Sequence, residues 1–124
     1  MVSEIKKKIL IAEDDRAISS ALKMKLESEG FEVTQAFDGK EAVETLGKAQ
    51  FDMMLLDLIM PVLDGFGVLQ EIKTKGIKIK SLILSNLGQE EDIIKTKELG
   101  AIDYIVKADL DLQQIVARIK SHMT

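Results

Sequence analysis

A short, unbroken apolar run that ends at a single acid is the feature that most constrains this chain. Residues 53–56 are all methionine or leucine, Asp57 follows them directly, and the chain's only proline is Pro61. An apolar run of strand length bounded by turn residues predicts a strand buried on both faces. Such strands belong to parallel sheets covered by helices, where ligands bind beyond the carboxyl ends of the strands. Asp57 is therefore the first candidate for chemistry.

Four more apolar segments alternate with segments of helical spacing along the rest of the chain. We expect these strands at residues 9–12, 31–37, 81–84 and 101–106. Five alternating strands and helices predict an α/β fold with right-handed crossovers. The expected architecture is a doubly wound five-stranded parallel sheet of the flavodoxin-like (β/α)5 type, with strand order 2-1-3-4-5. The helix at residues 90–99 has a thin apolar face, which predicts weak docking on the sheet.

The composition bounds the class of protein. The 124 residues suffice for one domain, so we expect a single unit over residues 1–124. The net charge of −4 argues against general attraction to nucleic acid or anionic membranes. The chain has no cysteine and no apolar run near the roughly 20 residues that span a bilayer. We therefore expect a cytoplasmic protein.

Four of the five expected strands are followed at once by polar or charged residues. These residues are Asp14 and Asp15, Asp57, Ser85, and Lys107. In a sheet of order 2-1-3-4-5, the strand that ends in apolar residues lies at an edge, so the four polar ends are neighbours. The sequence thus predicts a polar cluster at one end of the sheet.

Such a cluster suits phosphoryl transfer. Carboxylates that crowd together repel, and a hard divalent cation such as Mg²⁺ relieves the repulsion. Lys107 and Ser85 offer a point charge and a small donor for a phosphoryl group. Asp57, central in the sheet, is the best-placed nucleophile for an aspartyl phosphate.

Together these residues resemble the receiver domain of two-component response regulators, in a single-domain form like the chemotaxis regulators. The resemblance covers nearly the whole chain and rests on Asp14-Asp15, Asp57 to Pro61, Asp64-Gly65, Ser85, Tyr104 and Lys107. It implies that Asp57 accepts phosphate with Mg²⁺ bound by Asp14, Asp15, Asp57 and the backbone carbonyl of Ile59. It also implies that Lys107 contacts the phosphoryl group, and that Ser85 and Tyr104 move together as a switch.

The same resemblance implies the partners. A histidine kinase or phosphotransfer protein would supply the phosphate, and a downstream protein would bind the face built from the fourth helix, fifth strand and fifth helix. The domain itself would bind no nucleic acid and no membrane, and would be a monomer or a phosphorylation-dependent dimer. It would be no enzyme in the ordinary sense, although it would assist its own phosphorylation and slow dephosphorylation.

Two positions depart from the pattern of that family. Ala108 stands where a proline usually follows the lysine, so a cis bond there is improbable. Asn86 stands where a small residue usually follows the switch hydroxyl, and its amide could crowd the site or donate to it. Asn86 and Leu87 are expected to rim the site, as is Ile59. Aliphatic rim residues cannot orient a water, so we predict slow loss of phosphate.

Other interpretations stay open at this point. Asp14 and Asp15 could simply cap a helix, and Lys107 could be a surface charge. A degenerate receiver could act as a constitutive scaffold, and a receiver could be cut from a longer DNA-binding regulator. An aspartyl phosphohydrolase needs a second acid where Ile59 stands. A nucleotide- or flavin-binding module lacks support because no glycine-rich loop follows the first strand.

Overall fold

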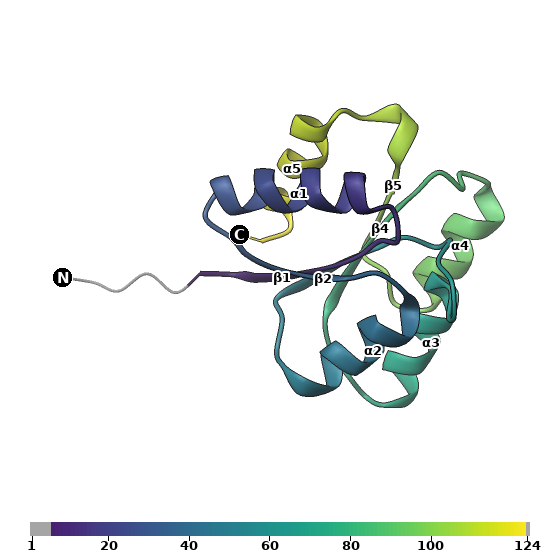
Figure 1. Ribbon diagram of the computed structural model, residues 1–124. Coiled ribbons are helices and arrows are strands. Elements are labelled where there is room, and N and C mark those ends of the chain that lie inside the picture. The colour runs from purple at the N-terminus through teal and green to yellow at the C-terminus, as the bar shows by residue number, and fades with distance from the viewer. Residues whose placement is uncertain (1–5, 124) are drawn as a thin grey trace.

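The computed structural model describes residues 6–123, which form five strands and five helices in strict alternation (Figure 1). A single 3-10 turn, η1, lies between the last strand and the last helix. The strands are β1 (Lys8–Ala12), β2 (Glu32–Ala36), β3 (Met53–Leu56), β4 (Lys80–Ser85) and β5 (Asp103–Val106). The helical elements are α1 (Arg16–Ser28), α2 (Gly39–Lys48), α3 (Gly65–Thr74), α4 (Glu90–Glu98), η1 (Lys107–Asp109) and α5 (Leu112–Ser121).

All five strands are parallel, in the order β2-β1-β3-β4-β5, and this confirms the predicted fold class and strand order. The last strand is shorter than predicted and begins at Asp103. Ile102 lies just outside it, where its N–H donates to the carbonyl of Ser81 at the border of the sheet. The register places Ala12 beside Leu56, so the carboxyl ends of β1 and β3 meet at one edge.

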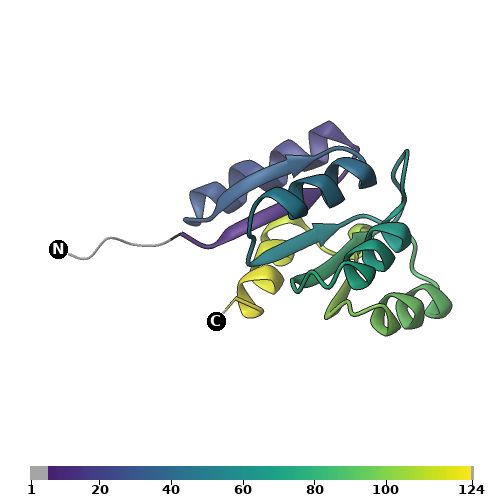
Figure 2. The same ribbon diagram turned by 90° about the horizontal axis from the view of Figure 1, so that it is seen from below.

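Helices cover both faces of the sheet, as Figures 1 and 2 show. Helices α1 and α5 pack on one face, and α2, α3 and α4 lie on the other. Because successive strand residues point to opposite faces, Ile9 and Ile11 face α1 and α5, whereas Leu10 and Ala12 face α2 and α3. The methionines of β3, Met53 and Met54, are fully buried and fill the two cores.

Helix α4 is the most weakly anchored of the five helices. Thr96 is its only buried residue, whereas each of the other helices buries three or four. Ile93 and Ile94 remain 39% and 49% exposed. The thin apolar face predicted for this helix is confirmed, and few buried contacts give α4 a low local stability.

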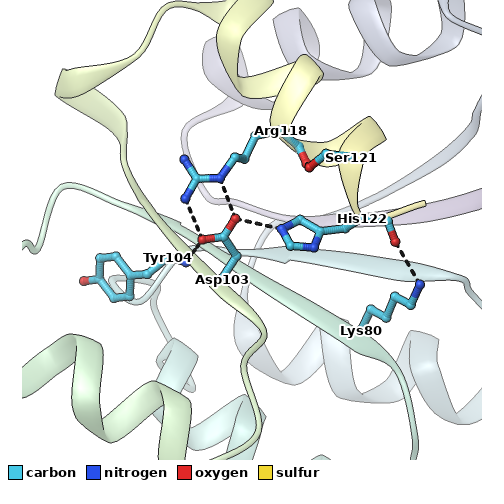
Figure 3. A network of polar contacts seen from close by, with 6 residues as sticks. All are labelled: Lys80, Asp103, Tyr104, Arg118, Ser121 and His122. Atoms are coloured by element: carbon cyan, nitrogen blue, oxygen red, sulfur yellow. Dashed lines mark hydrogen bonds and ion pairs between the residues drawn. The ribbon is translucent and has the colours of Figure 1, made fainter. Parts of the chain in front are cut away.

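A polar network holds α5 on the sheet, and Figure 3 shows it at close range. The carboxylate of Asp103 accepts hydrogen bonds from Arg118 Nε at 2.7 Å and Nη2 at 2.8 Å, and from the Tyr104 N–H. His122 Nε2 lies 2.8 Å from the same carboxylate, and Lys80 Nζ donates to the His122 carbonyl. Burial alone would raise the pKa of Asp103, but the contacts with His122 and Arg118 outweigh it and lower that pKa. The network therefore joins β4, β5 and the end of α5.

The start of α2 touches the loop after β3, and a matched pair of glycines tests this contact. A Cβ placed on Gly39 would lie 1.8 Å from the carbonyl oxygen of Leu63, whereas one on Gly47 in the same helix would meet nothing within 4 Å. We expect Gly39→Ala to destabilise the fold by about 1–3 kcal/mol through overpacking. Gly47→Ala should stabilise it by about 0.5–1 kcal/mol through helix propensity. Urea unfolding measures both, and equal shifts would show that the contact is unimportant.

Candidate functional site

Asp57 lies directly after β3 and is almost completely buried, with 6% of its surface exposed. Its N–H donates to the Ala12 carbonyl at 3.0 Å, which continues the pairing of β3 with β1. Its Oδ1 accepts a hydrogen bond of 3.2 Å from the Ile59 N–H, and its other oxygen is left for a different partner. The backbone thus fixes the position of the carboxylate at the edge of the sheet.

Lys107, at the end of β5, supplies that partner. Its Nζ donates to Asp57 Oδ2 at 2.9 Å and also forms an ion pair with the Glu13 carboxylate. All three side chains are largely buried, with exposures of 13% for Lys107, 7% for Asp57 and 4% for Glu13. Burial alone would lower the pKa of the Lys107 ammonium, but the contacts with Glu13 and Asp57 outweigh burial and raise that pKa. The lysine therefore stays charged between two acids.

Glu13 was absent from the predicted site, and the register of the sheet explains why it belongs there. Ile11 pairs with Leu55, so continuing this parallel register by two residues brings Glu13 beside Asp57 on the same face. The Glu13 N–H still donates to the Ala36 carbonyl, as in a strand. Burial raises the pKa of Glu13 to about 7, against the lowering effect of Lys107. The sequence shows that Glu13 directly follows a strand, but only the register of β1 against β3 shows that it lies beside Asp57.

The structure corrects the position predicted for Asp15. Carboxylate oxygens of Glu13, Asp14 and Asp57 lie within 4.8 Å of one another, and Asp15 is outside this cluster. The Asp15 side chain instead accepts a hydrogen bond of 3.1 Å from the Ile18 N–H and caps α1. The chain leaves the strand direction at this point to start the helix, so Glu13 and not Asp15 faces Asp57.

The donor set fits Mg²⁺. The ion prefers oxygen ligands, usually one or two carboxylates with water and phosphate oxygens. Among the described residues, Glu13 Oε1 is a buried acceptor whose only partner is the Lys107 ammonium of its ion pair. A cation beside Glu13, Asp14 and Asp57 would satisfy it further. The role predicted for the Ile59 carbonyl stays a prediction. Ile59 as a whole residue is 56% exposed.

The predicted switch residues are connected through Leu87. Ser85 is fully buried, and its Oγ accepts a hydrogen bond of 3.4 Å from the Leu87 N–H. The Tyr104 hydroxyl donates to the carbonyl of Leu87. Burial raises the pKa of this hydroxyl, and the charges of Asp92 and Asp57 add to the effect. A displacement of Ser85 would therefore disturb the backbone that holds Tyr104.

Asn86 and Ala108, the two positions that depart from the family pattern, both lie on the surface. Asn86 is exposed, and Ala108 is exposed within the turn η1. No cis peptide bond occurs in residues 6–123, so the bond between Lys107 and Ala108 is trans, as expected from the missing proline.

The loop that follows Asp57 contains a backbone outlier. Val62 has φ +71° and is 75% exposed, and a β-branched residue is rare in this left-handed region. Val62→Gly should raise the free energy of unfolding by about 1 kcal/mol, because glycine adopts this conformation without steric penalty. Chemical denaturation measures the difference. A loss of stability would show that the Val62 side chain makes a favourable contact that outweighs the backbone conformation.

The fold and the site together define a parallel α/β domain that holds a buried carboxylate beside a largely buried lysine and an acidic cluster. The response regulator receiver domain family matches residues 9–120, and the chain belongs to this family. No described helix has the length and hydrophobicity needed to cross a membrane.

Curated relatives and solved structures agree with this assignment. A probable transcriptional regulator, ycf27, of Guillardia theta is 39% identical over 95% of this chain. The DNA-binding dual master transcriptional regulator RpaA of Synechocystis is 37% identical over 92%. These matches cover 46% and 48% of the two relatives, so the chain spans about half the length of the curated relatives it matches.

Two solved structures show the same fold at substantial identity. The receiver domain of the Francisella response regulator 1452 has a TM-score of 0.86 and 33% identity, covering 93% of this chain and 94% of that one. The Borrelia burgdorferi CheX-CheY-BeF3-Mg+2 complex contains a chain with a TM-score of 0.89 and 30% identity, covering 97% and 91%.

Proposed function

We propose that Asp57 accepts a phosphoryl group from a histidine kinase or a phosphotransfer protein and that this event switches the domain. The observation that carries the proposal is the buried Asp57 carboxylate, which pairs with Lys107 at 2.9 Å and shares a cluster with Glu13 and Asp14. Phosphoryl transfer needs little covalent chemistry from a protein beyond a nucleophile, positioning and charge stabilisation. This site supplies all three.

The residues of the site have separate roles in that transfer. An oxygen of Asp57 forms the new bond to phosphorus while the bond from phosphorus to the donor's nitrogen breaks, and the electron pair leaves with that nitrogen. The Lys107 ammonium, released from its pair with Asp57, would pair with a phosphoryl oxygen. Mg²⁺, held by Glu13, Asp14 and Asp57, would supply further neutralisation of the phosphoryl charge.

The contacts around Leu87 support a route from the site to a binding face. If the Ser85 hydroxyl turns toward the phosphoryl group, it ceases to accept from the Leu87 N–H. The Leu87 carbonyl, which accepts from Tyr104, would shift with it. The weakly anchored α4 borders this loop, so the face of α4, β5 and α5 would change its partners. We place this switch in the cytoplasm and expect a monomer or a phosphorylation-dependent dimer.

The curated relatives favour transcription as the output. Both reported relatives are named transcriptional regulators, and RpaA is named as DNA-binding. We propose that this domain binds protein and not nucleic acid, because the region matched is the receiver domain and its charge is −4.

Intact mass spectrometry tests the proposed phosphorylation. The protein is incubated with a small phosphodonor and Mg²⁺, beside Asp57→Asn and a metal-free control. The gain of one phosphoryl group, lost in both controls, supports the acceptor and the metal dependence together. No gain in the wild type would favour a scaffold that keeps the fold without the switch, and a gain in Asp57→Asn would place the acceptor elsewhere.

We also predict that the phosphorylated form loses phosphate slowly. Ile59 and Leu87 lie two residues beyond Asp57 and Ser85, and neither aliphatic side chain can orient an attacking water. The double variant Ile59→Asn, Leu87→His should therefore lose phosphate several-fold faster than the wild type. The decay of the phosphorylated mass after removal of the donor measures both rates. Faster decay in the wild type would refute the shielding argument.

A further inference from the structure

A continuous groove crosses the side of the molecule that carries α3 and α4, away from Asp57. It consists of three hollows of about 480, 320 and 400 Å³. The first two share Lys73, Glu98 and Leu99, and the second and third share residues 77–79, which precede β4. We call this feature the α3–α4 groove, and it runs from Phe66 at the start of α3 to Phe51 before β3.

The floor of the α3–α4 groove is apolar and firmly held. Phe51, Phe66, Ile77, Ile79 and Leu99 are only partly buried, and each packs against the core formed with α2 and α3. Their inner surfaces are thus fixed by the core, while their outer surfaces line the groove. Such a surface offers apolar area to a ligand without a large cost of ordering its own side chains.

The rim of the groove carries exposed lysines. Lys73, Lys78 and Lys95 form no ion pair within residues 6–123, and Glu98 is the single acid that lines the three hollows. The Lys95 ammonium lies 4.4 Å from the centroid of the Phe66 ring, which joins α4 to α3 across the groove. This local positive charge occurs in a protein of net charge −4.

Helix electrostatics accounts for only part of this pattern. Lys73 and Lys95 lie in the last turns of α3 and α4, where a cation is favourable for any helix. Lys78 lies in neither helix, in a segment where lysines at positions 73, 75, 78 and 80 surround Ile77 and Ile79. Lys78 therefore adds positive charge at a position where no helix end requires it.

From these observations we propose that the α3–α4 groove binds an acidic amphipathic segment of a partner protein. The apolar side chains of this partner segment would lie on the floor of the groove, and its carboxylates would pair with Lys73, Lys78 and Lys95. The groove contains none of the residues assigned to phosphoryl transfer, so this inference goes beyond the proposed function. Because α4 has a single buried residue, Thr96, an occupant of the groove would also restrain α4.

Fluorescence anisotropy with a synthetic peptide tests the proposal on the unphosphorylated protein. The probe is a labelled amphipathic helical peptide with leucines on one face and glutamates elsewhere, and its control carries glutamine at every glutamate position. Lys73→Glu with Lys78→Glu should weaken binding about tenfold or more, since it replaces attraction by repulsion. Lys23→Glu with Lys25→Glu makes the same change of charge on α1, which packs on the opposite face of the sheet, and should leave binding unchanged. Thermal unfolding confirms that both variants fold.

Each outcome decides the proposal. Selective loss in the groove variant, with weak binding of the glutamine peptide, supports it. Equal losses in the two double variants would show general charge attraction and overturn it, as would no binding of the acidic peptide at about 1 mM. Displacement of the peptide by a short single-stranded RNA that binds more tightly would also overturn it in favour of nucleic acid. The intact-mass assay is repeated on the Lys73→Glu, Lys78→Glu variant. It shows whether phosphorylation is retained, so a loss of peptide binding is distinguished from a failure of phosphorylation.

Discussion

Lys107→Met is expected to lower the free energy of unfolding of the metal-free protein by about 3 kcal/mol at about pH 8. Removing one partner of a buried ion pair leaves an uncompensated charge, and such changes destabilise proteins by about 3–5 kcal/mol. Lys107 faces two acids, Asp57 and Glu13, which are 7% and 4% exposed. We take the low end of the range because Glu13 can relieve part of the repulsion by binding a proton.

A double-mutant cycle separates this charge effect from the loss of packing. Glu13→Gln should stabilise the Lys107→Met protein by more than it stabilises the wild type, and should recover more than half of the lost stability, because it removes one of two charges that no lysine then compensates. Urea unfolding at constant ionic strength measures the four proteins. Additive effects of Lys107→Met and Glu13→Gln would show that the lysine acts through packing and not through the ion pair. Lys120→Met is a matched control, because its partner Glu29 is on the exposed surface, where water and salt screen the ion pair, so its loss should change stability far less than Lys107→Met does.

The fold was predictable because its signals are local and repeated. The run at 53–56 is buried on both faces, as a central parallel strand must be, and it became β3. Asp38, Asp64 and Asp111 cap α2, α3 and α5 through side-chain hydrogen bonds, and such caps are readable from the sequence. The start of β5 was less predictable, because Ile102 is apolar yet lies outside the strand and is 45% exposed.

The site was predictable where it depends on strand order and not where it depends on register. Asp57 and Lys107 lie at the carboxyl ends of strands, and the fold brings them to 2.9 Å. The choice among Glu13, Asp14 and Asp15 depends on where β1 stops and α1 begins, and a shift of one residue turns a side chain to the other face. Because Glu13, Asp14 and Asp15 are three consecutive acids, the local sequence does not show where the strand ends and the helix begins.

The network around Asp103 could not be predicted for a different reason. Its members come from β4, β5 and the end of α5, and His122 is 19 residues from Asp103. A lone histidine near a chain end has no spacing motif, so only the packing of α5 against β5 reveals its partner.

Glu13→Gln should change how stability depends on pH in the absence of metal. The pKa of Glu13 is about 7 in the folded state, whereas an unperturbed glutamate, which represents the unfolded state, has a pKa of 4.5. Below pH 4.5 both states carry the proton, and Glu13 has no effect on stability. Between 4.5 and 7 the unfolded state ionises first, so stability is lost as the pH rises, and the loss is complete above about 7.

The variant removes this loss. We expect Glu13→Gln to be more stable than the wild type by at least about 1 kcal/mol at about pH 8, from a shift whose full value would be about 3 kcal/mol. The two proteins should converge near pH 4.5. Asp103 has the opposite sign, because its pKa is lowered and its contribution is lost only as the pH falls below the normal value of 3.8. Thermal unfolding of both proteins between pH 4.5 and about 7 therefore reports the effect of Glu13 and not that of Asp103.

Added Mg²⁺ provides the decisive comparison. An ion that binds the folded state stabilises it by about 2.7 kcal/mol at a concentration of about 100 times its Kd. Mg²⁺ should thus raise the melting temperature of the wild type at about pH 8 and remove the advantage of Glu13→Gln, which has lost one ligand. Asp57→Asn should behave like Glu13→Gln, being stabilised without metal and insensitive to it. Parallel stability curves for all three proteins, with and without Mg²⁺, would mean that the carboxylates of Glu13, Asp14 and Asp57 do not act as one cluster in solution.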